Sequence, residues 1–244
     1  MNNYLNKVAV KGNKNRKEAI LEILDSIGAK HKIVGRATEN IVVSFNPSSS
    51  RLVIGAHYDA ASEDIEAAND NAAACVILLN LIADLKDTSK SIDFVFFDRE
   101  ETREHFGSNE YIEIIGKENI EACINLDMCG LGHNVVLAYK DFGKPVFKKD
   151  PYKSFIEDCP NVMKELPSGD ADNFFKAGIP CIYIVNSTDR DLEWYRIYES
   201  NIWRAVAIYQ KYDFAQTMHL PSDTVSSLDP SGMELIYDYL AKRL

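Results

Sequence analysis

The sequence lacks any long apolar segment. Nowhere do about 18 uncharged apolar residues follow one another, which is the length that a transmembrane helix needs. Residues 1–20, MNNYLNKVAVKGNKNRKEAI, contain no apolar core of the kind found in signal peptides. We therefore expect no membrane partner and a cytoplasmic location.

Cysteine pairs and excess basic charge are also missing. The five cysteines, at positions 75, 123, 129, 159 and 181, are odd in number and form no C-x-x-C pair, which argues against a disulfide framework and a structural zinc knuckle. Lysine and arginine number 27 against 37 acidic residues, and the formal net charge of −10 repels phosphate backbones. Buried reduced thiols and no nucleic-acid partner are predicted.

The chain also shows no internal repeat, no low-complexity tract and no Pro/Gly/Ser-rich linker long enough to separate domains. Its 244 residues, 46% of them hydrophobic, suffice for one full core. We expect a single catalytic domain over residues 1–244, with no separate lid or accessory domain.

Apolar, β-rich runs alternate with helical patterns along the chain. This alternation predicts an α/β fold, namely a single-domain three-layer sandwich whose mixed, largely parallel central sheet is flanked by helices. The strands are expected at 40–45, 51–56, 92–97, 122–126, 133–138 and 180–185, and the helices at 16–28, 70–86, 108–116, 171–177, about 190–210, and 230–243. Gly28 and Asp229 are candidate caps of the first and last of these helices.

Residues typical of metal sites stand where the expected strands end, and the carboxyl ends of parallel strands form the open crevice of such sheets. His57 and Asp59 follow the strand at 51–56. In an extended chain this spacing returns both side chains to one face, so the Asp59 carboxylate could orient the histidine as a ligand. A surface turn would explain the same tripeptide without any function.

Carboxylates accompany three further elements. Asp70 precedes the helix at 70–86, where it could bind metal or act as an ordinary N-cap. Glu100 and Glu101 follow another strand, and one could bind metal while the other takes a proton, or both could belong to an acidic surface turn. Asp127 closes an apolar strand, where a charge is costly unless it is paired or metal-bound.

Several motifs then occur in an order that resembles the bacterial two-zinc aminopeptidase family, whose relatives include leucyl aminopeptidase, glutamate carboxypeptidase and glutaminyl cyclase. The resemblance covers residues 50–228. The motifs are IGAHYD (54–59), NDN (69–71), FFDREE (96–101), GS (107–108), INLDM (124–128), GIP (178–180) and MHLPSDT (218–224).

The resemblance implies that the chain is a zinc-dependent exopeptidase acting on peptides, with two zinc ions as cofactors. It implies Glu100 as the general base and Asp59 as the carboxylate that orients a ligand histidine. Asp70 would bridge the two ions, and the full set of implied metal ligands is His57, Asp70, Glu101, Asp127 and His219.

The chain departs from the family pattern at two places. The usual S-D-H tripeptide before G-I-P is replaced by residues 169–171, GDA, and the usual Gly-containing step after the glutamate pair by residues 102–105, TREH. Both lie outside the implied ligand set, so the family's substrate pocket cannot be transferred to this chain.

Other functions stay open at this stage. A glutaminyl-cyclase-like acyltransferase would use one zinc on a similar scaffold, and a catalytically inactive binding domain would keep the fold without metal. A carboxypeptidase or an N-acyl amino-acid hydrolase would share the metal chemistry, and a carboxylate-binding site would need a convergent arginine. The candidate arginines are Arg103, Arg190, Arg196 and Arg204.

Some conspicuous residues receive no functional role from the pattern. The histidines at 31, 105 and 133 lack any ligand spacing. The aromatic cluster of Trp194, Tyr195, Tyr198 and Trp203 has helical spacing and predicts helix packing. The irregular segment 139–169 is a candidate flap over the site.

Overall fold

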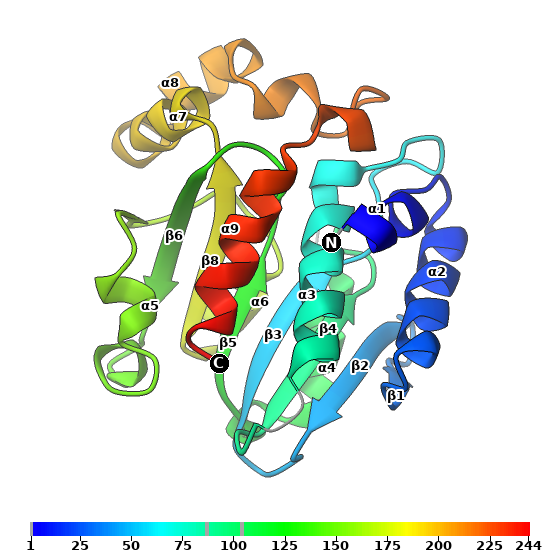
Figure 1. Cartoon of the computed structure of the whole chain (residues 1–244). Coiled ribbons are helices and arrows are strands. Elements are labelled where there is room, and N and C mark those ends of the chain that lie inside the picture. The colour runs from blue at the N-terminus through cyan, green and yellow to red at the C-terminus, as the bar shows by residue number, and fades with distance from the viewer. Residues whose placement is uncertain (1, 86–87, 103–104) are drawn as a thin grey trace.

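The computed structural model describes residues 2–85, 88–102 and 105–244. Within these residues the chain forms one eight-stranded sheet with helices on both faces (Figure 1). The strands are β1 (His31–Val34), β2 (Asn40–Phe45), β3 (Arg51–His57), β4 (Ile92–Phe97), β5 (Ile120–Leu126), β6 (Asn134–Lys140), β7 (Asn161–Met163) and β8 (Cys181–Ser187).

The strands lie in the order β1-β2-β4-β3-β5-β8-β6-β7. The central four, β4, β3, β5 and β8, run parallel, whereas β2 pairs antiparallel with β4 and β6 antiparallel with β8. The predicted α/β sandwich with a mixed, largely parallel sheet is therefore confirmed. Because the central strands share one direction, their carboxyl ends open at the same edge of the sheet.

Helices cover the two faces of the sheet and bury a separate apolar core against each. One face carries α1 (Asn2–Val8), α2 (Asn13–Ser26), α3 (Ala73–Asp84), α5 (Ser154–Glu157) and α9 (Pro230–Ala241). The other carries α4 (Phe106–Ile115), α6 (Ala171–Ala177), α7 (Asp189–Ser200) and α8 (Ile202–Ile208). Figure 1 shows α3 and α9 side by side across the near face.

Strand β3 shows why these runs are apolar throughout. Its side chains alternate, so Leu52 and Ile54 join the core under α3 while Val53 joins the opposite core. Gly55 leaves room for the ring of Phe97 on β4, whose Cε2 atom would lie 2.2 Å from a Cβ at that position. Both faces of the central strands are thus closed to water.

The predicted caps of the first and last long helices are confirmed. Gly28 has φ of +70° and donates its N–H to Asp25 O, while the Ala29 N–H reaches Leu24 O, which together end α2 in a Schellman motif. The Asp229 side chain accepts a hydrogen bond from the Ser231 N–H at the start of α9.

Two predicted helices are interrupted. The helix expected at 70–86 begins as a π-helical turn at Ala68–Ala72, in which Asp70 and Asn71 have non-helical dihedral angles and are joined by a cis peptide bond. The helix expected at about 190–210 divides into α7 and α8 because Asn201 has extended dihedral angles and caps α8 through the Arg204 N–H.

Helix α1 and strands β1 and β7 were not predicted, because β1 and β7 are short edge strands and α1 spans only two turns. Most of segment 139–169 lies away from the site, because β6 pairs with β7 at the sheet edge, whereas Pro167 and Ser168 of the candidate flap line the cavity described below. All five cysteines are buried and unpaired. Among the described residues, none of the helices combines the length and apolarity that crossing a bilayer requires.

Candidate metal centre

The implied ligand residues converge at the carboxyl edge of the parallel strands. His57 is the last residue of β3, Glu101 follows β4, and Asp127 follows β5. Asp70 lies in the π-helical turn that precedes α3. His219 lies in the long segment between α8 and α9, which contains no strand.

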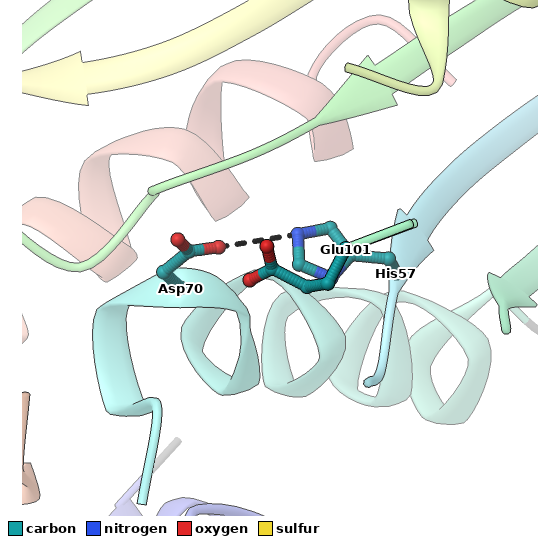
Figure 2. A group of neighbouring side chains, drawn as sticks. All are labelled: His57, Asp70 and Glu101. Atoms are coloured by element: carbon teal, nitrogen blue, oxygen red, sulfur yellow. Dashed lines mark ion pairs between the residues drawn. The ribbon is translucent and has the colours of Figure 1, made fainter. Parts of the chain in front are cut away.

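The two carboxylate oxygens of Asp70 face two different histidines. Its Oδ1 atom lies 3.2 Å from His57 Nε2, and its Oδ2 atom lies 3.3 Å from His219 Nε2. Asp127 Oδ1 lies 3.5 Å from His57 Nε2, and Glu101 Oε2 lies 3.0 Å from His219 Nε2. Figure 2 shows His57, Asp70 and Glu101 pointing toward one another above the start of α3. The structure therefore forms two groups of donor atoms that share Asp70.

The spacing of these atoms fits zinc. Ligand atoms about 2.0–2.1 Å from a tetrahedral zinc ion are about 3.3 Å from one another, and the distances within both groups lie close to that value. Three polar atoms of these side chains are buried without a hydrogen-bond partner in the described part of the chain, namely His57 Nε2, Asp127 Oδ1 and Glu101 Oε1. Imidazole and carboxylate ligands suit zinc, and buried polar atoms without partners are expected where a metal completes them.

The electrostatics of the site favour a cation. Burial raises the pKa of Glu101 to about 7. Hydrogen bonds with Asp70 and Glu101 raise the pKa of His219 to about 10. Burial opposes charge on His57, yet the charge of Glu100 and contacts with the other carboxylates raise its pKa well above the usual value. The carboxylates thus favour positive charge at both histidines, which is the kind of charge that a metal cation would supply.

Asp59 contacts the site through both its main chain and its side chain. The ring Nδ1 atom of His57 lies 3.1 Å from the main-chain oxygen of Asp59 and 3.6 Å from its carboxylate Oδ1 atom. The carboxylate also accepts hydrogen bonds from the main-chain N–H groups of Glu100 at 2.9 Å and Glu101 at 3.1 Å. The sequence pointed to the contact with His57 but not to the contacts with the glutamate pair.

A second carboxylate fixes the Asp70 turn. Asp223 is fully buried and accepts the main-chain N–H groups of Asn69 at 2.7 Å and Asp70 at 3.0 Å. The side chains of Asn69 and Asn71 hydrogen-bond to the main chain of the segment that carries Asp127. Asp223 had no role assigned from the sequence, although its presence within the motif MHLPSDT was the available signal.

Glu100 stands beside the donor groups without joining them. Its Oε2 atom lies 3.9 Å from His57 Nε2, and its Oε1 atom lies 3.0 Å from Nδ1 of His105. Burial raises the pKa of Glu100, which favours a group that accepts a proton and releases it again. His105, which received no role from the sequence, therefore contacts the proposed base. The other two histidines without a predicted role, His31 and His133, lie near surface carboxylates.

An apolar cavity of about 460 Å³ opens next to the donor groups. Trp194 and Tyr195 line it while they also pack in the core, so the predicted helix packing and a role in the cavity wall are both found. Trp203, by contrast, is 82% exposed. The remaining apolar and aromatic wall is formed by Met128, Pro167, Tyr183, Val185, Val206, Tyr209, Phe214 and Met218.

None of the described residues that line this cavity is an arginine or a lysine. The candidate residues Arg190, Arg196 and Arg204 are all exposed, and Arg190 pairs with Asp213 at 3.2 Å. Arg103 lies outside the described residues. Tyr183 donates a hydrogen bond of 2.7 Å to Asp127 Oδ2, which leaves Oδ1 of Asp127 facing His57.

Comparison with known proteins gives one family and several solved structures that share the fold. The family model described as Peptidase family M28 matches residues 40–243. The zinc aminopeptidase BSAP from Bacillus subtilis is similar at 19% identity and a TM-score of 0.60, over 83% of this chain and 48% of its own. The chain thus spans about half the length of that enzyme. A search of curated proteins finds no match.

Two solved structures of similar size also share the fold. The glutaminyl cyclase of Porphyromonas gingivalis is 18% identical with a TM-score of 0.67, over 99% of this chain and 94% of its own. A Zn-dependent exopeptidase from Parabacteroides distasonis is 18% identical with a TM-score of 0.67, over 98% of this chain and 93% of its own.

Proposed function

The chain belongs to peptidase family M28, and on that basis we propose that it is a zinc-dependent exopeptidase of the aminopeptidase kind that binds two zinc ions. The observation that carries the proposal is the position of Asp70, whose two oxygens lie 3.2 and 3.3 Å from the ring nitrogens of two different histidines. A carboxylate whose oxygens are divided in this way can hold one metal ion on each side.

Two ligand sets follow from this arrangement. His57 and Asp127 would complete the set on one side of Asp70, and Glu101 and His219 the set on the other. Zinc bound there would supply the Lewis-acid chemistry that peptide hydrolysis needs. The protein contributes rigidity, because strand ends and the Asp70 turn hold the donor atoms in place.

Glu100 is the general base in this proposal. Its free Oε2 atom faces the donor groups, where it would take a proton from the attacking water and deliver it to the leaving amine. The Tyr183 hydroxyl holds Asp127, and Asp59 holds the main chain of the glutamate pair. These contacts keep the base and the ligands in fixed relative positions.

The cavity supports cleavage at a free amino terminus. Carboxylates line its inner end, its wall is apolar and aromatic, and no lysine or arginine among the described lining residues could bind a terminal carboxylate. A peptide with a positively charged amine and a large apolar first side chain complements both features. A carboxypeptidase would instead need a cationic side chain in the cavity to bind the carboxylate at the end of its substrate.

A panel of substrates tests this function. The zinc-loaded protein should release the first residue from peptides with a free amine and leave the same peptides intact when the amine is acetylated. Preference for the acetylated peptides would contradict an aminopeptidase. Metal analysis of the same preparation should give two zinc ions per chain.

Glutaminyl cyclisation is the second candidate, because the Porphyromonas gingivalis cyclase matches nearly its whole length to this chain. The same assay separates the two functions. Conversion of amino-terminal glutamine to its cyclic form, with one tightly bound zinc ion and no release of free amino acids, would favour the cyclase. A protein that gains neither stability nor activity with zinc would instead be an inactive binding domain.

A further inference from the structure

His105 connects the proposed base to the protein surface. Its Nδ1 atom lies 2.7 Å from the main-chain oxygen of Glu100 and 3.0 Å from the Oε1 atom of the same residue. Its Nε2 atom lies 3.0 Å from the hydroxyl oxygen of Ser168, and that hydroxyl donates to Asp172 Oδ2 at 2.7 Å. These contacts run from a buried carboxylate to an exposed serine.

The hydrogen-bond partners determine which ring atoms of His105 carry hydrogen. Both neighbours of Nδ1 are oxygens of Glu100 that can only accept, so Nδ1 must donate. The single hydrogen of the Ser168 hydroxyl goes to Asp172, so its oxygen accepts and Nε2 must donate as well. An imidazole that donates from both nitrogens is an imidazolium.

The charges around His105 agree with this assignment. Burial opposes a charge on the ring, but the hydrogen bond and the charge of Glu100 raise the pKa of His105 to about 9. The buried carboxyl of Asp170 adds to the same effect, and Asp172 acts through Ser168. The described groups facing the ring are therefore acidic or hydrogen-bond acceptors.

This contact restrains the carboxylate of Glu100. With Oε1 held by His105, the side chain cannot rotate freely, and Oε2 is the oxygen that remains toward His57 at 3.9 Å. His105 lies in segment 102–105, where the chain departs from the family pattern.

We propose that His105, held as an imidazolium by Ser168 and Asp172, is a positioning residue that orients Glu100 and keeps its Oε2 atom directed at the metal centre. The inference rests on the proposed function, in which Glu100 is the base. During turnover Glu100 would accept the proton of water on Oε2 and pass it to the leaving amine, while His105 keeps both of its own protons.

The protonation state can be measured without any activity. In the zinc-loaded protein labelled with ¹⁵N-histidine, the His105 ring, identified by its loss in His105→Phe, should show two protonated nitrogens at pH 7. Ser168→Ala should change the Nε2 signal and leave Nδ1 nearly unchanged. A neutral ring in the unmodified protein would overturn the proposal.

Kinetics test the positioning role. His105→Phe keeps the ring volume but removes both donors, and should lower kcat by about 10- to 100-fold, as loss of a contact that orients an active-site group typically does. KM should stay within about twofold, and zinc content should not change. His105→Asn places an amide NH2 group where Nδ1 lies, so it keeps a donor toward Glu100 and should recover part of kcat, which a merely space-filling role would not predict.

The exposed residue His133 supplies the matched control, because it pairs only with a surface carboxylate among the described residues. His133→Phe should behave like the unmodified protein. Unchanged kcat in His105→Phe, or equal losses of kcat in the Phe and Asn variants, would overturn the proposal. If the unmodified protein cleaves no peptide, the proposed function fails, and the ring signals still decide whether His105 is held as an imidazolium.

Discussion

Asp59 Oδ1 accepts a hydrogen bond of 2.9 Å from the main-chain N–H of Glu100. The two residues are far apart in sequence but follow the neighbouring strands β3 and β4, whose carboxyl ends lie at the same edge. The second oxygen of Asp59 binds the N–H of Glu101 in the same way. One carboxylate therefore positions both the proposed base and a proposed ligand.

Asp59→Asn should weaken zinc binding and catalysis together. The oxygen of the new amide can accept from one of the two main-chain N–H groups, but its NH2 group faces the other N–H and cannot accept from it. The turn that carries Glu100 and Glu101 must therefore shift. We expect zinc affinity or kcat/KM to fall by about 10- to 100-fold, measured by competition with a chelator and by peptide hydrolysis. Asp64→Asn, an exposed carboxylate in the same loop, is the control, and equal behaviour of the two variants would contradict the role of Asp59.

Glu100→Gln should separate catalysis from metal binding. The amide cannot accept and return a proton, so kcat should fall by roughly a hundredfold or more, the usual scale of a general acid–base contribution. Zinc content should stay the same because Glu100 belongs to neither donor group. Peptide hydrolysis and metal analysis measure the two quantities, with the exposed Glu234→Gln as control. Normal turnover in Glu100→Gln would rule out this base.

Zinc should stabilise the protein against heat through Asp70. At a zinc concentration about 100 times Kd, binding contributes about 2.7 kcal/mol. For a domain of this size this corresponds to a rise in Tm of roughly 5–10 °C. Adding a chelator in a thermal-shift experiment should reverse the rise.

Asp70→Ala should remove this response, because both donor groups lose their shared ligand. Asp64→Ala should retain it, since that side chain is exposed and outside the site. A zinc-dependent rise in Tm of normal size in Asp70→Ala would show that zinc stabilises the protein at some other place.

The apolar cavity should determine which peptides are cleaved. A peptide that begins with leucine or phenylalanine should have a kcat/KM at least about tenfold above one that begins with aspartate, since apolar pocket contacts contribute on this scale. Val206→Lys places a charge on the cavity wall and should reduce that preference. Ile202→Lys alters the same helix at an exposed position outside the wall and serves as control. Equal effects of the two variants would mean that this wall does not contact the first side chain.

Much of the architecture could be predicted because it depends on local patterns. The strands of the sheet's centre are apolar on both faces, and the caps at Gly28 and Asp229 depend on a few neighbouring residues. Helical periodicity does not show the breaks at Asp70 and Asn201, because long-range contacts hold the Asp70 turn and the Asn201 side chain caps a new helix there.

In the candidate site, too, some features could be predicted from the sequence and others depend on the tertiary structure. The sequence alone pointed to residues of metal-binding type at strand ends, and the order of its motifs indicated the family that the model match then established. What each side chain contacts was decided by tertiary structure. Asp59 binds the main chain of Glu100 in addition to facing His57, and His105 contacts both Glu100 and Ser168, which lies far along the sequence.

The physical reason lies in the range of the forces involved. Short stretches of sequence contain the apolar periodicity that determines the strands of the sheet. They also contain the acidic and histidine residues that follow these strands, so these side chains lie at one edge of the sheet. Hydrogen bonds act over about 3 Å and depend on direction. Only the packed chain, which brings Asp223 beneath Asp70 and Ser168 against His105, could decide which of those side chains bind, which position others, and which proton each one carries.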